Sequence, residues 1–278
     1  MNRAIKIISA LLVLNIFIWG FIILREKSFA GYFFSVGQGD SEMIVLPGNK
    51  EARILIDGGP NFKIISELEK VLPFFSRRID LVLASHTDGD HIGGLSEVFN
   101  RYQVGAFVFN GEEGGESFEN LSKILKEKNI PIIILKEKDK IKYGENFFKV
   151  LNSKEGVREK NENSLVLLLE AENKKILFTG DISQKIEEAI LEKEKIGEID
   201  ILKVAHHGSK YSSGENFISN INPKISIIEV GKNSYGHPTY ETLNRLESVK
   251  SLIFRTDERG TIKVEADKEG KIKVYSLK

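Results

Sequence analysis

The sequence contains no cysteine, few histidines and no excess of charge of either sign. Its 278 residues include 40 Lys and Arg, 40 Asp and Glu, and five His. The absence of cysteine excludes disulfide bonds and thiolate metal sites, although it does not identify the cellular compartment. A formal net charge of zero is not typical of proteins that bind nucleic acid through a strongly basic surface. Any metal site must therefore be built from histidines and carboxylates.

Linkers and repeats are also lacking. No segment rich in Pro, Gly and Ser divides residues 31–278, and no repeat with a solenoid period is present. The composition, with 41% hydrophobic and 29% charged residues, is that of an ordinary globular protein. We therefore predict one domain over residues 29–278, preceded by a separate segment over residues 1–28.

That first segment is strongly apolar. Residues 7–24 carry no charge, and basic residues lie on both sides of them. As a helix this stretch would extend about 27 Å, close to the roughly 30 Å hydrocarbon core of a bilayer. We predict a single membrane-spanning anchor, with the domain outside the cytoplasmic membrane. The alternative is a signal peptide cleaved near residues 28–30.

Beyond residue 28, apolar runs alternate with segments of helical periodicity, which predicts an α/β fold. Several predicted strands end in a polar residue, namely Asp57, His86, Asp181 and the doublet of His206 and His207. Loops at the ends of strands are where layered α/β folds assemble their sites. Helices are predicted over residues 63–72, 94–101, 117–128, 184–195 and 240–246, and a hairpin over residues 164–179.

The densest group of polar side chains is the run that contains His86, Asp88, Asp90 and His91. Carboxylates this close together repel each other unless a cation neutralises them. Mixed nitrogen and oxygen ligands suit Zn²⁺ or Mn²⁺. We expect these side chains to project from a tight, glycine-containing turn rather than from a helix. The alternative, a polar loop, gives no reason for this order of residue types.

The same run resembles the His-x-His-x-Asp-His signature of the metallo-β-lactamase fold, with Asp88 in place of the second histidine. Gly180-Asp181 is similar to the position of the bridging aspartate in that superfamily. More narrowly, the chain resembles the hydrolase domain of the ComEC family of competence proteins. The segments that carry this resemblance lie, in order, at residues 36–40, 55–59, 86–91, 161–166, 178–181, 202–209, 235–238 and 254–257.

The resemblance implies a four-layer αβ/βα sandwich with two divalent metal ions, zinc or manganese, at one rim. His86 and Asp88 would hold the first metal, while Asp90 and His91 would hold the second. Asp181 would bridge the two ions. A histidine of the doublet would complete the second site, and we favour His207.

One family ligand has no counterpart here. The histidine expected just before the strand that begins near residue 164 is replaced by polar residues that include Asn161. The first metal would therefore be held by fewer ligands, so that it exchanges readily, prefers manganese or binds together with substrate. Asn161 would contact substrate or metal through its amide, or else serve only as a turn residue.

Catalytic roles are expected for Asp90, His206 and His237. Adjacent side chains at a strand end face opposite ways, so we predict that only one histidine of the doublet ligates the second ion. We expect His206 to contact substrate or transfer a proton, although the two roles could be exchanged. His237 would approach the leaving group, or else stabilise its own loop.

Four further residues are expected around the ligands. Asp40 and Asp57 would accept hydrogen bonds from ligand histidines and so orient them. Their alternative role is that of exposed turn residues. Ser209 and Lys210 would bind a phosphate of the substrate, with Lys210 as a point charge. A solvated lysine is the alternative.

These features favour a membrane-anchored, metal-dependent phosphodiesterase or DNA nuclease related to competence and DNA uptake. A hydrolase of small esters, lactones or phosphodiesters at the cell surface is the second hypothesis, favoured by the lack of a basic and aromatic stripe. The third is a non-catalytic accessory that binds DNA. The sequence does not name the substrate, because one fold serves many chemistries.

Overall fold

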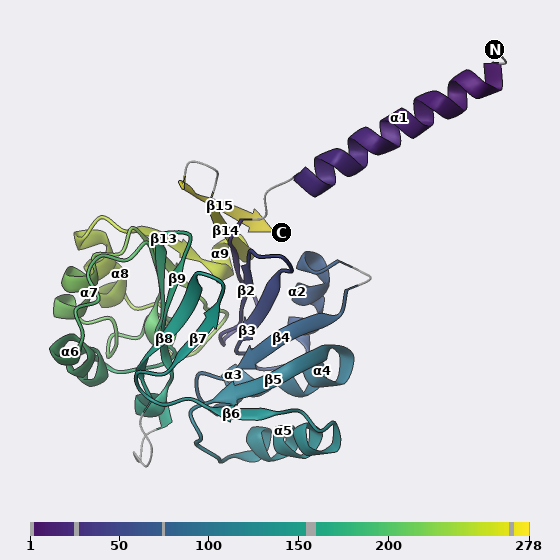
Figure 1. The fold of residues 1–278 in the computed structure, drawn as a ribbon. Coiled ribbons are helices and arrows are strands. Elements are labelled where there is room, and N and C mark those ends of the chain that lie inside the picture. Colours follow the sequence, from purple (N-terminus) through teal and green to yellow (C-terminus); the bar gives the residue numbers. More distant parts are fainter. Residues whose placement is uncertain (1–2, 25–27, 74–75, 154–159, 267–269, 278) are drawn as a thin grey trace.

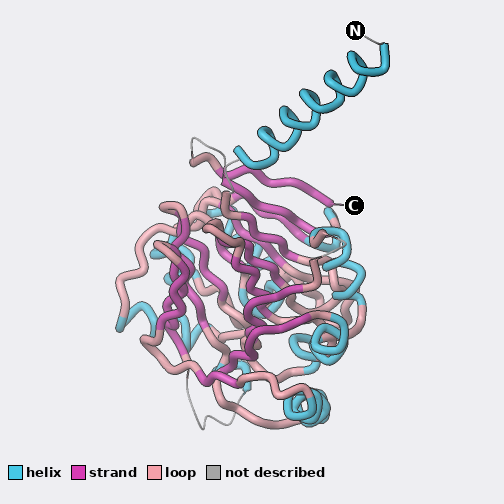
Figure 2. Tube along the Cα trace, turned by 45° about the vertical axis from the view of Figure 1, so that its right-hand side comes forward, coloured by secondary structure: helices cyan, strands magenta, loops and turns pink. Residues whose placement is uncertain are grey.

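The computed structural model describes residues 3–24, 28–73, 76–153, 160–266 and 270–277. Within these residues two β-sheets face each other, and helices cover the outer face of each sheet (Figure 1). The strands lie in the middle of the domain when it is turned by 45° (Figure 2). The predicted four-layer αβ/βα sandwich is confirmed.

The first sheet combines an antiparallel part with a parallel part. Strands β3, β4, β5 and β6 run parallel, and the remaining neighbours run antiparallel. In spatial order the strands are β15 (Ile272–Leu277), β14 (Thr261–Ala266), β1 (Ala30–Phe33), β2 (Glu42–Leu46), β3 (Ala52–Ile56), β4 (Arg78–Leu83), β5 (Gln103–Phe109) and β6 (Ile132–Ile134).

The second sheet also combines a parallel part with an antiparallel part. Its strands β10 to β13 run parallel and β7 to β10 antiparallel. In spatial order they are β13 (Leu252–Arg255), β12 (Ile225–Ile228), β11 (Ile201–Lys203), β10 (Lys174–Phe178), β9 (Val166–Ala171), β8 (Asn146–Asn152) and β7 (Lys140–Tyr143). Every residue of β11 and β12 is buried, as expected for parallel strands covered on both faces.

Helices on opposite sides of the sandwich belong to different parts of the chain (Figure 1). One side is formed by α2 (Lys63–Val71), α3 (Gly89–Ile92), α4 (Leu95–Arg101) and α5 (Glu116–Glu127). The other side is formed by α6 (Gln184–Lys193), α7 (Glu215–Ile221) and α8 (Tyr240–Ser248). The short elements are α9 (Thr256–Arg259) and the 3₁₀ turns η1 (Lys160–Asn163) and η2 (Ala205–Gly208).

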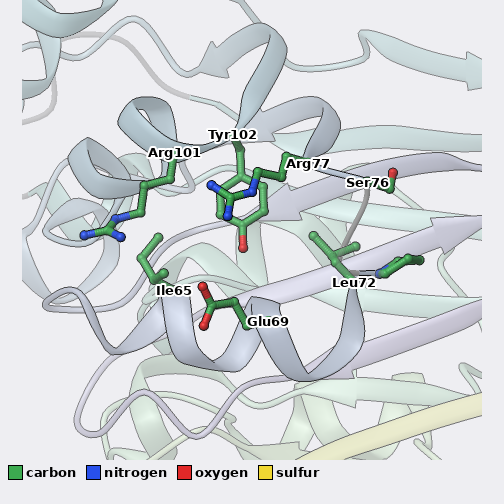
Figure 3. A pocket seen from close by; sticks show the side chains of 8 residues that line it. Ile65, Glu69, Leu72, Ser76, Arg77, Arg101 and Tyr102 are labelled. Carbon is green, nitrogen blue, oxygen red and sulfur yellow. The ribbon is translucent and has the colours of Figure 1, made fainter.

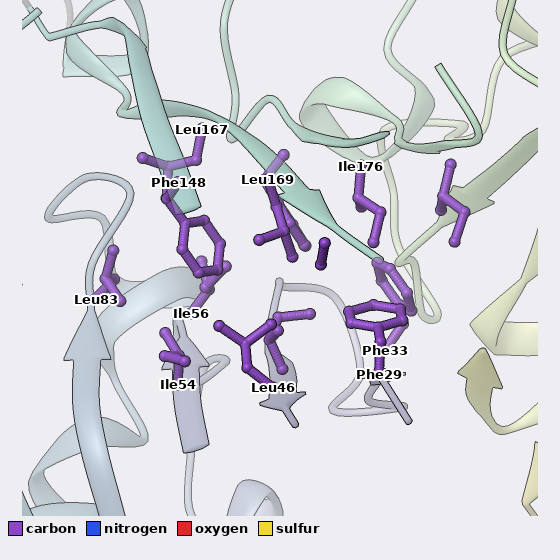
Figure 4. Packing of buried hydrophobic residues seen from close by; sticks show 14 of the residues in the cluster. Phe29, Phe33, Leu46, Ile54, Ile56, Leu83, Phe148, Leu167, Leu169 and Ile176 are labelled. Carbon is purple, nitrogen blue, oxygen red and sulfur yellow. The ribbon is translucent and has the colours of Figure 1, made fainter. Parts of the chain in front are cut away.

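Apolar side chains fill all three spaces between the layers. Figure 4 shows the central one, where Phe33 and Leu46 of the first sheet lie near Leu169 and Ile176 of the second. A second cluster packs the first sheet against α2, α4 and α5, and a third packs the second sheet against α6, α7 and α8. The two sheets are therefore held in fixed positions, which fixes the loops at their common rim.

The predicted helices and the predicted hairpin are confirmed. The helix expected over residues 63–72, for example, is α2, which buries Ile64, Ile65 and Leu68 as its spacing requires. The hairpin is formed by β9 and β10. The boundaries differ from the predicted ones by a few residues at most.

The N-terminal segment is helical, as α1 (Arg3–Leu24), and it extends away from the domain (Figures 1 and 2). Its described apolar side chains, which include Ile7, Leu12 and Phe17, are exposed. Within the described part of the chain, no helix meets the length and apolarity needed to cross a membrane. The prediction of a membrane-spanning helix is thus not supported. The basic residues that follow the apolar stretch, Arg25 and Lys27, lie outside the described residues.

Candidate metal centre

The residues predicted as ligands lie where parallel strands of the two sheets end. In the first sheet, β3 leads to Asp57 and β4 leads to His86. In the second sheet, β10 leads to Asp181, and β11 leads through η2 to His207. Since the carboxyl ends of both parallel groups meet at one rim, the two halves of the chain contribute to a single site.

The segment after β4 differs from the expected turn. Asp88 directly precedes α3, and Asp90 and His91 lie within that helix. The expectation that no helix carries these side chains is therefore wrong for two of them. The short helix directs His91 inward, where its ring lies 4.0 Å from that of His86, centroid to centroid.

The doublet also has a geometry that the sequence did not predict. His206 and His207 both adopt left-handed backbone angles, with φ of 51° and 52°, inside η2. The two histidines therefore do not lie in an extended strand end, as the prediction for the doublet had assumed. Such a conformation is uncommon for residues other than glycine and is often found at functional sites. It buries His207, whereas the side chain of His206 is 34% exposed.

Four side chains form the centre of the cluster. One ligand atom each from Asp90, His91, Asp181 and His207 lies within 4.8 Å of the others. Asp181 is central, because Oδ1 lies 3.4 Å from Nε2 of His91 and Oδ2 lies 4.0 Å from Nε2 of His207. Asp90 Oδ2 lies 3.4 Å from the same atom of His207. This arrangement places nitrogen and oxygen donors around one small volume.

Three buried nitrogen and oxygen atoms at the cluster have no hydrogen-bond partner within the part of the chain that the structure describes. They are Nε2 of His86, Nε2 of His91 and Oδ1 of Asp181. Buried polar atoms are usually satisfied, and those that are not require an explanation such as an ion. Histidine nitrogens and carboxylate oxygens are suitable ligands for Zn²⁺ and similar divalent ions. The residues present therefore fit the metal centre that their pattern implies.

The far sides of the ligand histidines are hydrogen-bonded. Nδ1 of His91 lies 2.7 Å from Oδ2 of Asp57. Asp57 also accepts the backbone N–H and the hydroxyl of Ser85, at 2.7 and 2.6 Å. Nδ1 of His207 donates to the carbonyl oxygen of Glu229 at 2.9 Å. These bonds leave the Nε2 atoms directed at the cluster, as is common for metal-ligating histidines.

The titration behaviour of the site reflects its surplus of carboxylates. Burial disfavours the imidazolium of His207, but Asp40 and Asp181 raise its pKa to about 10. Burial opposes protonation of His91 as well, yet Asp181, Asp57 and Asp40 raise its pKa well above the ordinary value. Without a metal, these histidines hold protons that balance the carboxylates. The site therefore attracts positive charge.

On the side of the expected first metal, the ligands are fewer. His86 is buried, and its burial, with the charge of His91, lowers its pKa to about 4. Its Nε2 lies 3.8 Å from Oδ2 of Asp88, which is partly exposed. Asn161 lies in η1, and its backbone carbonyl accepts a hydrogen bond from Ser164. Since Leu165 bonds to the carbonyl of Ser85, this segment borders the His86 side of the site.

Two histidines lie on the solvent side of the cluster. Nε2 of His206 is 3.8 Å from Oδ2 of Asp181. The ring of His237 lies 5.7 Å from that of His206, and burial together with the charge of His206 lowers the pKa of His237. Both are therefore placed to contact a molecule that reaches the ligands from solvent.

The side chains of Ser209 and Lys210 contact Tyr211 of their own loop, and their backbone carbonyls accept hydrogen bonds from α6 and α8. Ser209 is buried, and its hydroxyl accepts the backbone N–H of Tyr211 at 3.3 Å. Lys210 is exposed, with its ammonium 5.2 Å from the centre of the Tyr211 ring. These contacts give no specific support to the predicted phosphate-binding role.

Three buried charged residues near the site were not predicted from the sequence. They are Glu42, Lys203 and Glu229, each no more than 2% exposed. The available signal was a charged residue at the end of an apolar run, because Lys203 is the last residue of β11 and Glu229 directly follows β12. Asp40, which was predicted, contacts both Lys203 and His207.

A pocket of about 230 Å³ lies elsewhere, between α2 and α4 (Figure 3). Ile65, Glu69, Arg101 and Tyr102 are among the residues that line it. Among the described residues, none of the groups able to hold a metal includes a residue of this pocket. The rim of the sandwich is therefore the candidate site.

Comparison with known proteins agrees with this geometry. The metallo-beta-lactamase superfamily profile matches residues 36–231. ComE operon protein 3 of Bacillus subtilis is 32% identical over 246 residues, which cover 82% of this chain and 32% of that protein. Recombination protein 2 of Haemophilus influenzae is 29% identical over 252 residues, covering 82% of this chain and 28% of that protein. The chain thus spans about a third of the length of these relatives.

Solved structures agree at the level of the fold. The metallo-beta-lactamase fold protein YhfI of Bacillus subtilis superposes with a TM-score of 0.59 at 12% identity. The match covers 90% of this chain and all of that one. At this low identity the similarity establishes the fold alone.

Proposed function

The chain belongs to the metallo-beta-lactamase superfamily, and from that premise we propose that it is a metal-dependent phosphodiesterase with DNA as its leading substrate. The observation that supports this proposal is the convergence of Asp90, His91, Asp181 and His207 on one volume beside His86. Two divalent ions bound there would supply a water activated for attack and Lewis acids that stabilise charge on a phosphoryl oxygen.

The candidate ligands would be shared between the two ions. Asp90, His91 and His207 would hold one ion, and His86 and Asp88 the other. Asp181 would be shared by the two ions, as the family resemblance implies, and its oxygens lie 3.4 Å from Nε2 of His91 and 4.0 Å from Nε2 of His207. The side chains of His91 and His207 are held by buried hydrogen bonds, so these two residues would need little rearrangement to bind an ion.

Proton transfer would fall to His206. Its ring is partly exposed and lies beside Asp181, so it can reach both the cluster and a substrate in solvent. In phosphodiester hydrolysis the leaving oxygen must gain a proton, and a histidine is suited to donate it near neutral pH. His237 would assist from the adjacent loop, since its ring packs against that of His206.

The choice of DNA rests on similarity to competence proteins rather than on a surface feature. A small ester, lactone or phosphodiester is the alternative substrate class, favoured by the formal net charge of zero. A DNA-binding accessory without turnover is the third possibility, and the number of converging ligands argues against it.

In the decisive experiment the chain of residues 1–278, purified in mild detergent, is given several substrates together with Mn²⁺ or Zn²⁺. These are single- and double-stranded DNA, bis(p-nitrophenyl) phosphate, p-nitrophenyl acetate and a lactone. We expect cleavage of DNA and of the phosphodiester, and loss of cleavage in Asp90→Ala and Asp181→Ala variants that keep the wild-type circular dichroism. Turnover of the ester or lactone alone would reject the phosphodiesterase and favour the small-molecule hydrolase.

Localisation at a membrane is a further part of the proposal. It rests on the apolar sequence of residues 7–24, which carry no charge, and on the exposure of the described apolar side chains of α1. We expect the protein to stay with membranes during carbonate extraction, and a variant that lacks residues 1–28 to be released. Protease added to intact spheroplasts should digest the domain if it lies outside the cytoplasmic membrane, and full protection would reverse the orientation.

A further inference from the structure

Lys203 is a fully buried lysine at the end of β11, 1% exposed. Its ammonium donates to Oδ2 of Asp40, which is equally buried. Lysine is almost never fully buried unless it is paired, because its charge loses hydration. The pair lies beneath His207, in the interior behind the metal cluster. Its position there calls for a function beyond packing.

The partner of Lys203 is Asp40 rather than either neighbouring glutamate. Burial raises the pKa of Glu42 to about 8 and raises that of Glu229 well above its usual value. Burial alone would also raise the pKa of Asp40, but Lys203, His207 and His91 hold it well below the ordinary range. The ammonium of Lys203 donates directly to Oδ2 of Asp40, and this contact identifies Asp40 as its partner.

Asp40 also contacts the ring of His207. Its Oδ1 lies 3.1 Å from Nδ1 of that histidine, which donates to the carbonyl oxygen of Glu229. With Nδ1 held in this way, Nε2 is directed to Asp90 at 3.4 Å and to Asp181 at 4.0 Å. The carbonyl of Glu229 and the carboxylate of Asp40 thus both lie against Nδ1 of this candidate ligand, so the position of the Asp40 carboxylate contributes to the orientation of the ring.

The other inner histidine is oriented without a lysine. Asp57 holds Nδ1 of His91 and is itself fixed by the backbone and hydroxyl of Ser85. Asp40 has a backbone hydrogen bond from its own N–H to the carbonyl of Asp90, at 3.3 Å. Its carboxylate, however, is fixed by the side chain of Lys203. The two orienting carboxylates therefore depend on different supports.

From this we propose that Lys203 is a positioning residue for the metal held by His207, because its pairing with Asp40 fixes the group that aims His207 at the cluster. The inference rests on the proposed metal centre. If Lys203 affected the site only through its positive charge, its removal would raise the metal affinity, because a nearby cation repels a metal ion. If Lys203 positions His207, its removal lowers the metal affinity. The sign of the change in metal affinity therefore separates the two roles.

The experiment compares the wild-type chain of residues 1–278 with its Lys203→Met variant. Zn²⁺ affinity is measured by competition with a chromophoric chelator, and the visible spectrum is recorded after loading with Co²⁺. We expect the dissociation constant of the second ion to rise 10- to 100-fold, the usual effect of losing a group that orients a ligand, while that of the other ion stays unchanged. The visible absorption bands of Co²⁺ at the second site should shift, because the geometry of its ligands changes. A loss of folding stability alone would leave these bands unchanged.

Two further variants separate positioning from stability. Ile190→Ala removes buried side-chain volume on α6 and should lower stability without changing either metal affinity. The double variant Lys203→Met/Asp40→Asn buries no unpaired charge, so it should fold more stably than Lys203→Met while its second ion stays weakly bound.

Unchanged or tighter binding of the second ion in Lys203→Met, or wild-type affinity in the double variant, would overturn the role of Lys203. Failure of the wild-type protein to bind two ions would instead reject the metal centre itself, and the inference with it.

Discussion

At the scale of single residues, the neighbouring histidines 206 and 207 lie in different surroundings. His207 is 2% exposed and hydrogen-bonded behind its ring, while a third of the His206 side chain is exposed. We predict that His207→Ala loses bound metal and turnover together. His206→Ala should keep its metal but turn over about 10²- to 10⁴-fold more slowly, the usual loss of a general acid. Metal analysis and kcat measured on one preparation test this, and the reverse pattern would exchange the two roles.

Glu187 gives the protein a pH dependence that is separate from the metal centre. Its carboxyl is buried, and burial raises its pKa to about 7 despite hydrogen bonds from the N–H groups of Ser213 and Gly214. Because the pKa of Glu187 is higher in the folded than in the unfolded protein, the folded protein binds the proton more tightly. The resulting contribution to the free energy of unfolding is fully present below pH 4.5 and is lost as the pH rises to about 7. At about 1.4 kcal/mol for each pH unit, the loss is at most roughly 3 kcal/mol.

The variant Glu187→Gln should remove this pH dependence. We expect urea unfolding of the metal-free wild-type protein to show falling stability from pH 4.5 to 7, with a flatter curve for the variant. Glutamine accepts through one oxygen only, so the variant should also lose about 1 kcal/mol at low pH. Parallel curves for the two proteins over this range would show that the carboxyl does not titrate there.

At the scale of elements, the loop between β12 and α8 is organised by one amide. The side chain of Asn233 accepts the N–H groups of Tyr235 and His237 and donates to the carbonyls of Gly231 and His237. The loop thereby holds the ring of His237 beside that of His206. A single side chain thus sets the position of a predicted catalytic group.

We predict that Asn233→Ala lowers kcat/KM about tenfold, equivalent to about 1.4 kcal/mol of lost transition-state stabilisation, without loss of metal. Ser234→Ala, at an exposed position of the same loop, is the matched control and should leave kcat/KM unchanged. Equal activity of the two variants would mean that the loop does not take part in catalysis.

The elements that the sequence predicted correctly are those with a strong hydrophobic period. The spacing of Ile64, Ile65 and Leu68 sufficed for α2, and apolar runs sufficed for the buried strands. The short helix α3 has four residues, too few to show a period. The left-handed turn at His206 was likewise not predictable, because it depends on tertiary contacts that offset its local cost.

The candidate site was predictable only in part for a related reason. Histidines and aspartates that follow predicted strands suggest a metal site, and their pattern resembled that of a known family. Lys203 and Glu229 lie next to apolar residues and gave no such pattern. Their importance arises from burial, which a single sequence does not reveal for a charged residue.

At the scale of the whole molecule, the ligands come from both sheets and so connect the two halves of the sandwich. His86, Asp90 and His91 follow the first sheet, whereas Asp181 and His207 follow the second. A metal ion bound between them would therefore stabilise the packing of one half on the other. Binding to the folded state alone adds about 4 kcal/mol when the free metal is at 1,000 times its dissociation constant.

We predict that removal of metal with a chelator lowers the melting temperature by about 10 °C. The Asp181→Ala variant, which lacks the central ligand, should melt at the same temperature with and without chelator. Differential scanning calorimetry of both proteins provides the measurement. A wild-type melting temperature that does not respond to metal would show that the halves are held together without it.

Because the candidate ligands come from two sheets, they are synthesised at different times. Asp90 and His207 meet in the cluster although 117 positions separate them in the chain. At synthesis rates of about 5 to 20 residues per second, roughly 6 to 23 s pass between the translation of the two residues. During that interval a nascent chain presents an incomplete ligand set, so the complete centre can take up its ions only after residue 207 has left the ribosome.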